Sequence, residues 1–313
     1  MFDIFVDSAA NIPAEKVREY GIKVISFKNF VNGEYITCFD PNASEEEERV
    51  NGKKYYDALR NGAECKTSLV SIQEFADAFE QSLKEEKDVL YISLSHGISG
   101  TFNSARLAIE SLVDEYPNQK MFALDSYNAS LGQGLLAIYA SILRAKDMPV
   151  EKVFHILDSA KLGMNGIFTV DDLKYLAATG RVSNAKAFLG NTLNVKPLLK
   201  GSHEGVIVQF KLARGRKKSL KTLINLVLEN IIEPEKQILG IAHADAYEES
   251  LYIMNEIQKE IKVKDFINTT YDFCTGTHVG PETIALFFIG GNRELEGNKE
   301  ASYAKELLEE LGN

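Results

Sequence analysis

The chain has 313 residues, of which 45% are hydrophobic and 26% charged, so it can bury a sizeable core and has room for two domains. Its 35 basic and 45 acidic residues give a formal net charge of −10, which argues against non-specific binding of nucleic acid or anionic membranes. Three widely spaced cysteines indicate reduced thiols, and no apolar run reaches the roughly 18 residues of a membrane-spanning helix. We therefore expect a cytoplasmic protein with no integral membrane segment and no nucleic-acid partner.

The first elements predict a parallel sheet. Residues 2–6 alternate as a strand, an amphipathic helix follows Ile12-Pro13 and ends at Gly21, and residues 22–27 form the next strand. Strand, helix and strand in this order are typical of a βαβ unit. Asn32-Gly33 separates two strand-like runs and predicts a hairpin.

The next segment is polar before the helical pattern returns. Residues 41–52 are acidic and indicate a solvated loop or the start of a helix. Thr67 and Ser68 precede a predicted helix, where they are candidates for capping. Ser71 and Glu74 form a capping box at the start of that helix.

The stretch 90–106 predicts a place for an anion. A strand over 90–94 ends in a turn of small polar residues, Ser95–Thr101, and a helix begins at Asn103. The first turn of a helix leaves N–H groups unpaired and carries partial positive charge. Two glycines in the turn let an oxyanion approach this backbone, and Ser99 adds a hydroxyl donor.

A second glycine pattern lies after the predicted strand at 121–124. Gly132-x-Gly134-x-x-Ala137 matches the dinucleotide-binding fingerprint loosely. The glycines lie inside the helix predicted over 132–143, however, and no acidic residue follows a clear second strand. Close helix packing is therefore favoured over a nucleotide site.

Met148-Pro149 indicates a domain boundary, and the chain changes character after it. Helices are predicted at 150–163, 173–178, 219–231, 248–261 and 299–311, and a further helix that carries Leu189 and Leu193 follows Arg181-Val182-Ser183. Strands are predicted at 166–170, 238–242, 266–273 and 283–289. A hairpin is predicted at 202–211 and a glycine-rich loop at 275–281.

Complete catalytic motifs are missing from the chain. Its five histidines include no HExxH and no pair three or four residues apart, so no metal site is expected. Gly97-Ile98-Ser99-Gly100 lacks the spacing of a nucleophile elbow, and no P-loop is present. A binding protein is therefore favoured over an autonomous enzyme. An acyl hydrolase or transferase using Ser99 or Ser95 with His278 remains the alternative; His278 itself is either a structural residue or a polar contact in a site.

Several blocks, in order, resemble those of the DegV family of bacterial fatty-acid-binding proteins. The similar blocks are Asp7-Ser8, 66–71 (TSQPS in the family), 93–102 (SSxLSGTY), 125–126 with 132–134, 172–183 (DLxYLxKGGRIS), 194–199, 214–218 and 278–281 (HTGPG). The resemblance covers essentially the whole chain, and its SGT, GRxS and HxGP blocks are specific together. This chain departs from the family blocks at Leu69-Val70, His96 and Glu282.

The resemblance implies a two-domain α/β fold. An N-terminal α/β/α domain with a parallel sheet would span 1–149 and a C-terminal two-layer α/β domain 150–313, with one long-chain fatty acid buried between them. Some family members are the binding subunits of a bacterial fatty acid kinase, whose separate ATP-binding partner phosphorylates the carboxyl group to an acyl phosphate. The resemblance thus implies a lipid-binding, non-catalytic protein with no cofactor beyond its fatty acid. A carrier of another apolar acid without a kinase partner remains open.

The resemblance also assigns residues. Thr67, Ser99 and His278 would bind the carboxylate, with Ser95 and the amides of Gly100 and Thr101 as neighbours. Arg181 would lie near the carboxyl opening, in contact with the kinase or the transferred phosphate. Arg214 and Arg216 belong to a basic cluster that is either a solvated helix start or a docking patch for the kinase.

Overall fold

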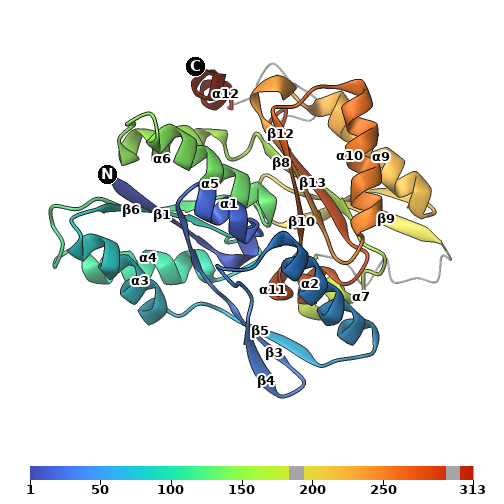
Figure 1. Cartoon of the computed structure of the whole chain (residues 1–313), viewed down its shortest axis with the longest axis horizontal. Coiled ribbons are helices and arrows are strands. Elements are labelled where there is room, and N and C mark those ends of the chain that lie inside the picture. The colour runs from blue at the N-terminus through green and yellow to red at the C-terminus, as the bar shows by residue number, and fades with distance from the viewer. Residues whose placement is uncertain (183–193, 294–303, 313) are drawn as a thin grey trace.

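The computed structural model describes residues 1–182, 194–293 and 304–312, which form two large sheets and one small sheet (Figure 1). The helix expected around Leu189 and Leu193, and the beginning of the expected C-terminal helix, lie outside the described residues.

The N-terminal sheet is parallel, as the βαβ pattern predicts. Its strand order is β2-β1-β6-β7, and Ile4 of β1 lies between Ile22 of β2 and Leu90 of β6. The strands are β1 (Phe2–Asp7), β2 (Ile22–Ile25), β6 (Asp88–Ser93) and β7 (Met121–Asp125).

Helices cover both faces of this sheet because its strands are apolar on both sides. Phe5 of β1 packs with Phe75 and Phe79 of α3 (Ile72–Lys84), next to α4 (Thr101–Leu112). Ile4 and Val6 face the other way, toward α5 (Leu131–Arg144) and α6 (Val150–Ala160). The short helices η1 (Ser8–Ala10) and α1 (Ala14–Glu19) connect β1 to β2.

The C-terminal sheet is mixed, with strand order β10-β9-β8-β13-β11-β12. Only β11 and β12 pair in parallel; the other neighbours run antiparallel. Its strands are β8 (Met164–Thr169), β9 (Val195–Gly201), β10 (Ile207–Arg214), β11 (Ile238–His243), β12 (Asp265–Thr270) and β13 (Ile284–Ile289). Helices α9 (Arg216–Asn230) and α10 (Tyr247–Glu260) cover one face. Three shorter helices of this half are α7 (Lys174–Thr179), η2 (Pro234–Lys236) and α12 (Lys305–Gly312).

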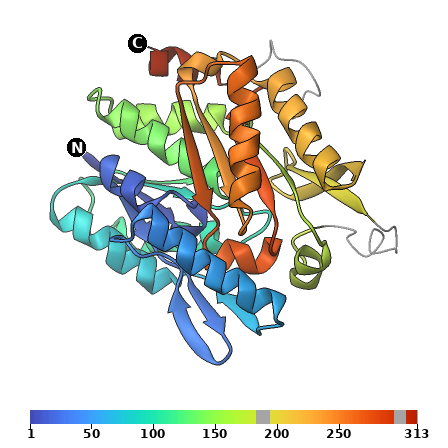
Figure 2. The ribbon, with the colours of Figure 1, turned by 45° about the vertical axis from the view of Figure 1, so that its right-hand side comes forward.

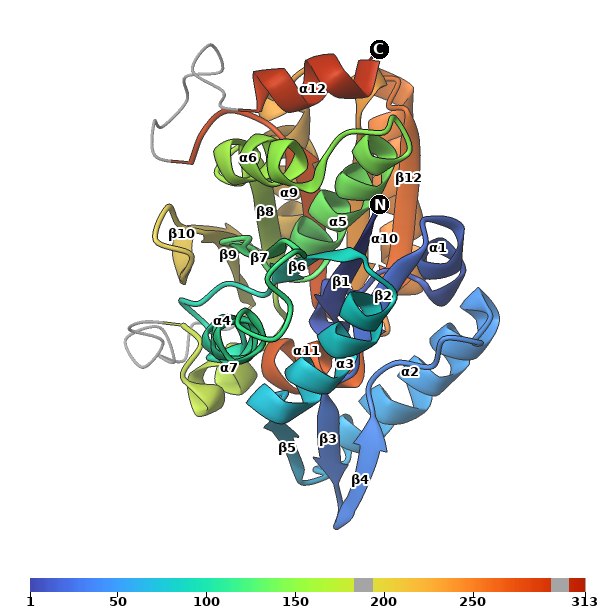
Figure 3. The same ribbon diagram turned by 90° about the vertical axis from the view of Figure 1, so that its left-hand side faces the viewer.

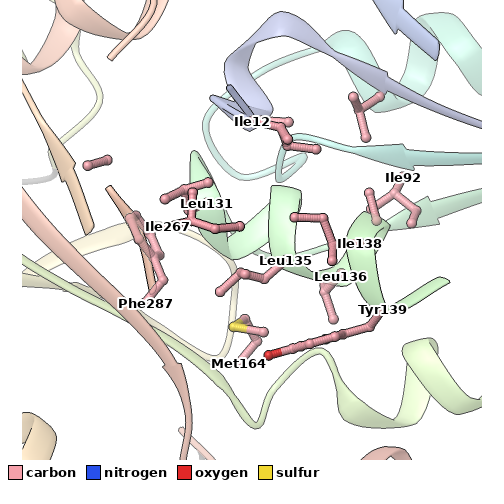
Figure 4. Close-up of a cluster of buried hydrophobic side chains, with 14 of the residues drawn as sticks. Ile12, Ile92, Leu131, Leu135, Leu136, Ile138, Tyr139, Met164, Ile267 and Phe287 are labelled. Atoms are coloured by element: carbon pink, nitrogen blue, oxygen red, sulfur yellow. The ribbon is translucent and has the colours of Figure 1, made fainter. Parts of the chain in front are cut away.

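Helix α5 lies between the two large sheets. Figure 4 shows its Leu131 and Leu135 beside Phe287 of the C-terminal sheet, while Ile138 lies toward Ile92 of the N-terminal sheet. Twelve of its 14 residues are buried, as expected for a helix that is apolar all round. A Cβ atom on Gly134 would lie 2.6 Å from the carbonyl oxygen of Ala10, so this glycine permits close packing, as the sequence predicted.

The small sheet has the strand order β4-β3-β5, and its strands β3 and β5 contact helix α11 (Phe273–Val279) of the C-terminal half. The predicted hairpin at Asn32-Gly33 is confirmed by β3 (Lys28–Val31) and β4 (Glu34–Thr37). Thr67 and Ser68 do not cap a helix; they end strand β5 (Cys65–Ser68), which pairs with β3. The helix start expected in the acidic segment is confirmed by α2 (Glu45–Arg60), whose capping box joins Ser44 and Glu47.

Helix α2 reaches across to the C-terminal half, and Figure 2 shows it beside β12 and α11. The hydroxyl of Tyr56 donates to the carbonyl of Tyr271 at 3.1 Å. The glycine-rich loop predicted at 275–281 is wrong over its first part, because Phe273–Val279 forms helix α11. The carboxylate of Asp272 caps this helix by accepting the Thr275 N–H at 2.8 Å.

The fold class predicted from the sequence is confirmed: a parallel sheet in the N-terminal part and a separate mixed sheet in the C-terminal part. The division at residue 149 stays a prediction. Helix α6, just after it, packs on α5 and on the N-terminal sheet. Within the described ranges, no helix is both long and apolar enough to cross a membrane.

Candidate functional site

Four residues singled out from the sequence line one cavity of about 130 Å³. Thr67 comes from the end of β5, Ser99 from the turn before α4, Arg181 from the segment after α7, and His278 from the last turn of α11. Figure 3 shows these elements gathered on one side of the molecule. The remaining wall contains apolar side chains, among them Leu69 and Leu176.

The histidine in this cavity is neutral at pH 7. Burial lowers the pKa of His278 to about 4, helped by the positive charge of Arg181. Its Nε2 lies 3.1 Å from Oγ1 of Thr67, while Nδ1 is buried and has no hydrogen-bond partner within the described residues. The Nδ1 nitrogen can therefore donate a hydrogen bond to a ligand or accept one from it, depending on the tautomer of the imidazole.

A buried network holds the helix that carries His278. Nδ2 of Asn29 on β3 lies 2.8 Å from the Tyr55 hydroxyl and 2.9 Å from Oγ1 of Thr277, and it donates to the carbonyl of Phe273 at 2.8 Å. Three elements distant in sequence, β3, α2 and α11, therefore meet next to the cavity.

Hydrogen bonds on both sides of Ser99 stabilise the turn before α4. The Ser99 hydroxyl lies 2.8 Å from Oγ1 of Thr101 and accepts the Thr101 N–H at 3.3 Å, at the helix start that follows Gly100. Ser95 donates its hydroxyl to the carbonyl of Gly205 at 2.7 Å, which ties the turn to the β9–β10 hairpin. Ser95 and Thr101 hold Ser99 in place, and the cavity wall itself comes from Ser99.

The three arginines singled out from the sequence have different surroundings. Arg181 lines the cavity and donates to the carbonyl of Thr179 at 2.5 Å. Arg216, at the start of α9, is engaged by Glu249 through an ion pair whose Nε–Oε1 distance is 3.1 Å. Arg214 is exposed at the end of β10.

A second, deeper cavity of about 60 Å³ shares a wall with the first. The shared residues are Ile98, Ala129, Ile207, Thr275 and Val279. The deeper cavity continues between the two large sheets to Phe168 and Phe287. The two cavities are therefore adjacent, and the polar side chains of Thr67, Ser99 and His278 line the first of them.

Thr275 is a site residue that sequence reasoning missed. It lines both cavities. It precedes His278 by three residues, so the two share a face of α11. This spacing was readable in the sequence once the segment was recognised as a helix.

Comparison with known proteins gives the family. A model described as uncharacterised proteins of the DegV family matches residues 1–291. The chain belongs to the DegV family. A DegV domain-containing protein of Clostridium perfringens is 34% identical over 294 residues, which is 94% of this chain and 99% of the relative.

Two solved structures of DegV proteins share the fold. A DegV lipid-binding protein from Thermotoga maritima is 28% identical with a TM-score of 0.79, and the match covers 94% of this chain and 100% of that one. DegV from Bacillus subtilis, described as a fatty acid binding protein, is 29% identical with a TM-score of 0.74, covering 91% and 98% respectively.

Three DegV blocks meet at the carboxylate of Asp7. The buried carboxylate of Asp7 accepts hydrogen bonds from Tyr91 at 2.7 Å and Gln133 at 3.0 Å, and from the N–H of Leu94 at 3.2 Å. Burial raises the pKa of Asp7, with no cation among these partners. The network fixes the end of β1 against the strand that leads into the Ser99 turn.

The departures from the DegV blocks have structural counterparts. Glu282, where the family block has glycine, adopts a left-handed φ of 63°, and its carboxylate pairs with Arg60 of α2. His96 is half exposed, and its Nδ1 lies 2.5 Å from Asp125. Leu69 lines the cavity. Among the described residues, no group of three histidine, cysteine or acidic side chains could hold a metal ion.

Proposed function

We propose that this DegV protein binds a long-chain fatty acid. The carboxylate lies in the outer cavity against Thr67, Ser99 and His278, and the acyl chain enters the deeper cavity. The observation that carries the proposal is a cavity lined by Thr67, Ser99 and His278 that shares five wall residues with a mainly apolar cavity in the interior. The descriptions of the Thermotoga maritima and Bacillus subtilis relatives as lipid-binding and fatty acid binding support it.

The energetics of such a site divide between head and tail. Hydroxyl and neutral imidazole groups can hold a carboxylate, and each hydrogen bond to a charged group contributes about 1.5–3 kcal/mol. Burial of the tail contributes about 0.8 kcal/mol per methylene, or roughly 11 kcal/mol for about 14 methylenes, as an upper bound. Affinity would therefore come mainly from the tail, while the donors fix the position of the head.

We further propose that the protein presents this carboxylate to a separate fatty acid kinase and is not itself the catalyst. A carboxylate oxygen would attack the terminal phosphorus of ATP, forming the acyl phosphate as ADP leaves. Neutral donors leave that oxygen more available than a bidentate arginine would. Arg181 at the mouth and the exposed Arg214 are the proposed contacts for the transferred phosphate or the kinase; Arg216, engaged by Glu249, is the less available of the basic residues.

Native mass spectrometry of the protein purified from bacterial cells tests binding directly. We expect a non-covalent adduct of fatty-acid mass, lost on denaturation. Ser99→Ala combined with His278→Ala should weaken retention, whereas Ser111→Ala, an exposed serine near the other end of α4, serves as the matched control. Ala129→Phe, in the wall shared by both cavities, should reject long chains. Full retention in the double variant would refute the head-group assignment.

Two further assays separate the alternatives. Addition of a bacterial fatty acid kinase and ATP should yield acyl phosphate only when the loaded protein is present. Labelling of Ser99 by a fluorophosphonate, with ester turnover, would instead favour a hydrolase. The hydrogen bonds in the cavity favour binding, because the Ser99 hydroxyl contacts Thr101 and the His278 imidazole contacts Thr67 rather than each other.

A further inference from the structure

A third cavity, of about 220 Å³, lies next to Tyr271, the residue that follows strand β12. Its walls come from η1, the end of β4 and the segment that follows it, the first half of α2, and residues 269–273. The deeper fatty-acid cavity also borders Tyr271, which is the one described residue that lines both. The third cavity is larger than the outer and deeper cavities, which measure about 130 Å³ and 60 Å³.

The side chain of Tyr271 faces the interior between the two large sheets. Buried residues alternate along β12, at Ile267 and Thr269, and Tyr271 continues this alternation with only 4% of its surface exposed. Ile267 and Tyr271 belong to the hydrophobic cluster around α5. Burial raises the pKa of Tyr271, and the hydroxyl of Ser130, just before α5, opposes this effect. The phenol ring therefore extends from the end of β12 toward Ser130, which lines the deeper cavity.

Backbone hydrogen bonds fix Tyr271 on both sides. Its N–H donates to the carbonyl of His243 on β11 at 2.9 Å, and its own carbonyl accepts the Tyr56 hydroxyl at 3.1 Å. The next residue, Asp272, caps α11, the helix that carries His278. Because the main chain is held in this way, the size and orientation of the Tyr271 ring decide whether the third cavity and the deeper cavity are joined.

The third cavity can accept an apolar occupant because the protein itself engages the buried acids in its wall. Asp272 accepts hydrogen bonds from Asn11 at 3.1 Å and from Ser8 at 3.3 Å, and Glu48 accepts the N–H of Ala14 at 2.9 Å. Burial raises the pKa of Asp272 to about 6 and that of Glu48 to about 7, so neither carboxyl is as strongly acidic as usual. The wall also contains the apolar side chains of Ile12, Cys38, Phe39 and Ala43.

We propose that Tyr271 sets the upper limit of acyl-chain length in this protein. Its ring closes the deeper cavity against the third one, so a chain that fills the outer and deeper cavities can extend no further. Without the ring the cavities are joined, and the last methylenes of a longer chain lie against Ile12 and Phe39. The inference rests on the proposed fatty-acid function and adds to it the residue that decides which chains are accepted.

Competition between two acids measures this limit. The full chain, freed of lipid, is incubated with an equimolar mixture of octadecenoic and docosenoic acid, and native mass spectrometry gives the ratio of the two complexes. Burial of each methylene changes affinity about fourfold, so the four additional methylenes of docosenoic acid favour it once they have a place. We expect the wild-type protein to bind mainly octadecenoic acid, and Tyr271→Ala to raise the proportion of docosenoic acid at least tenfold.

Further variants locate the effect. Tyr271→Leu removes less volume and should change the ratio in the same direction, which keeps the test decisive if Tyr271→Ala does not fold. Tyr271→Phe restores the ring and should restore the wild-type ratio. Ala43→Phe, added to Tyr271→Ala, places a ring in the third cavity and should cancel the gain. Phe79→Leu is the matched control, because this fully buried ring lines none of the three cavities, and it should leave the ratio unchanged.

The outcomes separate this inference from the function on which it rests. Binding of neither acid by the wild-type protein would refute the fatty-acid function and the chain-length limit together. Binding of octadecenoic acid, with an unchanged ratio in the folded Tyr271→Ala and Tyr271→Leu variants, would overturn the chain-length limit alone. Equal binding of both acids by the wild-type protein, or a gain that survives Ala43→Phe, would also overturn it.

Discussion

The network of Asn29, Tyr55 and Thr277 should respond more strongly to a double substitution than to the sum of its parts. Nδ2 of Asn29 has two hydrogens and three acceptors within reach: the Tyr55 hydroxyl at 2.8 Å, the Phe273 carbonyl at 2.8 Å and the Thr277 hydroxyl at 2.9 Å. Asn29 is fully buried, so water cannot replace a lost partner.

The magnitudes follow from counting acceptors. Tyr55→Phe or Thr277→Val alone leaves two acceptors for two hydrogens, so each should cost only about 1 kcal/mol for the lost hydroxyl. The double variant leaves a single acceptor, and one buried N–H then carries its desolvation penalty of about 1–3 kcal/mol. The double variant should therefore be less stable than the sum of the singles by about 1–2 kcal/mol.

Urea unfolding of the four proteins in this cycle measures the coupling. The chain contains 13 tyrosines and no tryptophan, so tyrosine fluorescence and far-UV circular dichroism are the two probes, and their transitions must coincide. Tyr116→Phe, a tyrosine near the surface whose hydroxyl donates to Glu80, is the matched control. Costs that add to within about 0.5 kcal/mol would refute the shared-acceptor reasoning.

Two other variants test burial elsewhere in the molecule. His243 is 2% exposed, and burial lowers its pKa to about 4. In the unfolded chain the pKa of this histidine is near 6.5, so between about pH 6.5 and 4 the unfolded chain binds more protons than the folded one. The free energy of unfolding therefore falls as the pH drops through this window, by about 3 kcal/mol for His243. His243→Gln should flatten the acid limb of a stability–pH profile, and an unchanged slope would contradict this. Gly134→Ala should destabilise by about 1–3 kcal/mol in urea unfolding, because its Cβ would lie 2.6 Å from the Ala10 carbonyl; equal stability would mean that α5 can shift away.

Local sequence patterns predicted much of the fold. The parallel βαβ unit, the hairpin at Asn32-Gly33 and the capping box at Ser71 depend on residues close together in the chain, and each is present. The predictions that were wrong concern residues whose contacts are distant in the sequence. Gly276 suggested a loop, yet it lies in a helix, where the Tyr56 ring leaves no room for a side chain: a Cβ there would lie 2.4 Å from the Tyr56 hydroxyl.

The candidate site likewise depends on contacts between residues that are distant in the sequence. Thr67 and His278 are 211 residues apart, and no periodicity in the sequence could bring them together. Their association was expected only from the resemblance to DegV proteins. Thr275 was missed because its role follows from the helix that the sequence did not reveal. The pairing of Glu282 with Arg60 likewise became visible only when α2 was seen to reach the C-terminal half.

The position of α5 constrains how any molecule can enter or leave the interior. Its apolar side chains contact both large sheets at once, so pulling the two halves apart like a hinge would expose one side of this helix to water. We expect ligand exchange to proceed instead through small movements at the rim, where the Ser95–Thr101 turn meets the β9–β10 hairpin, while the central helix keeps the two halves in a fixed relation.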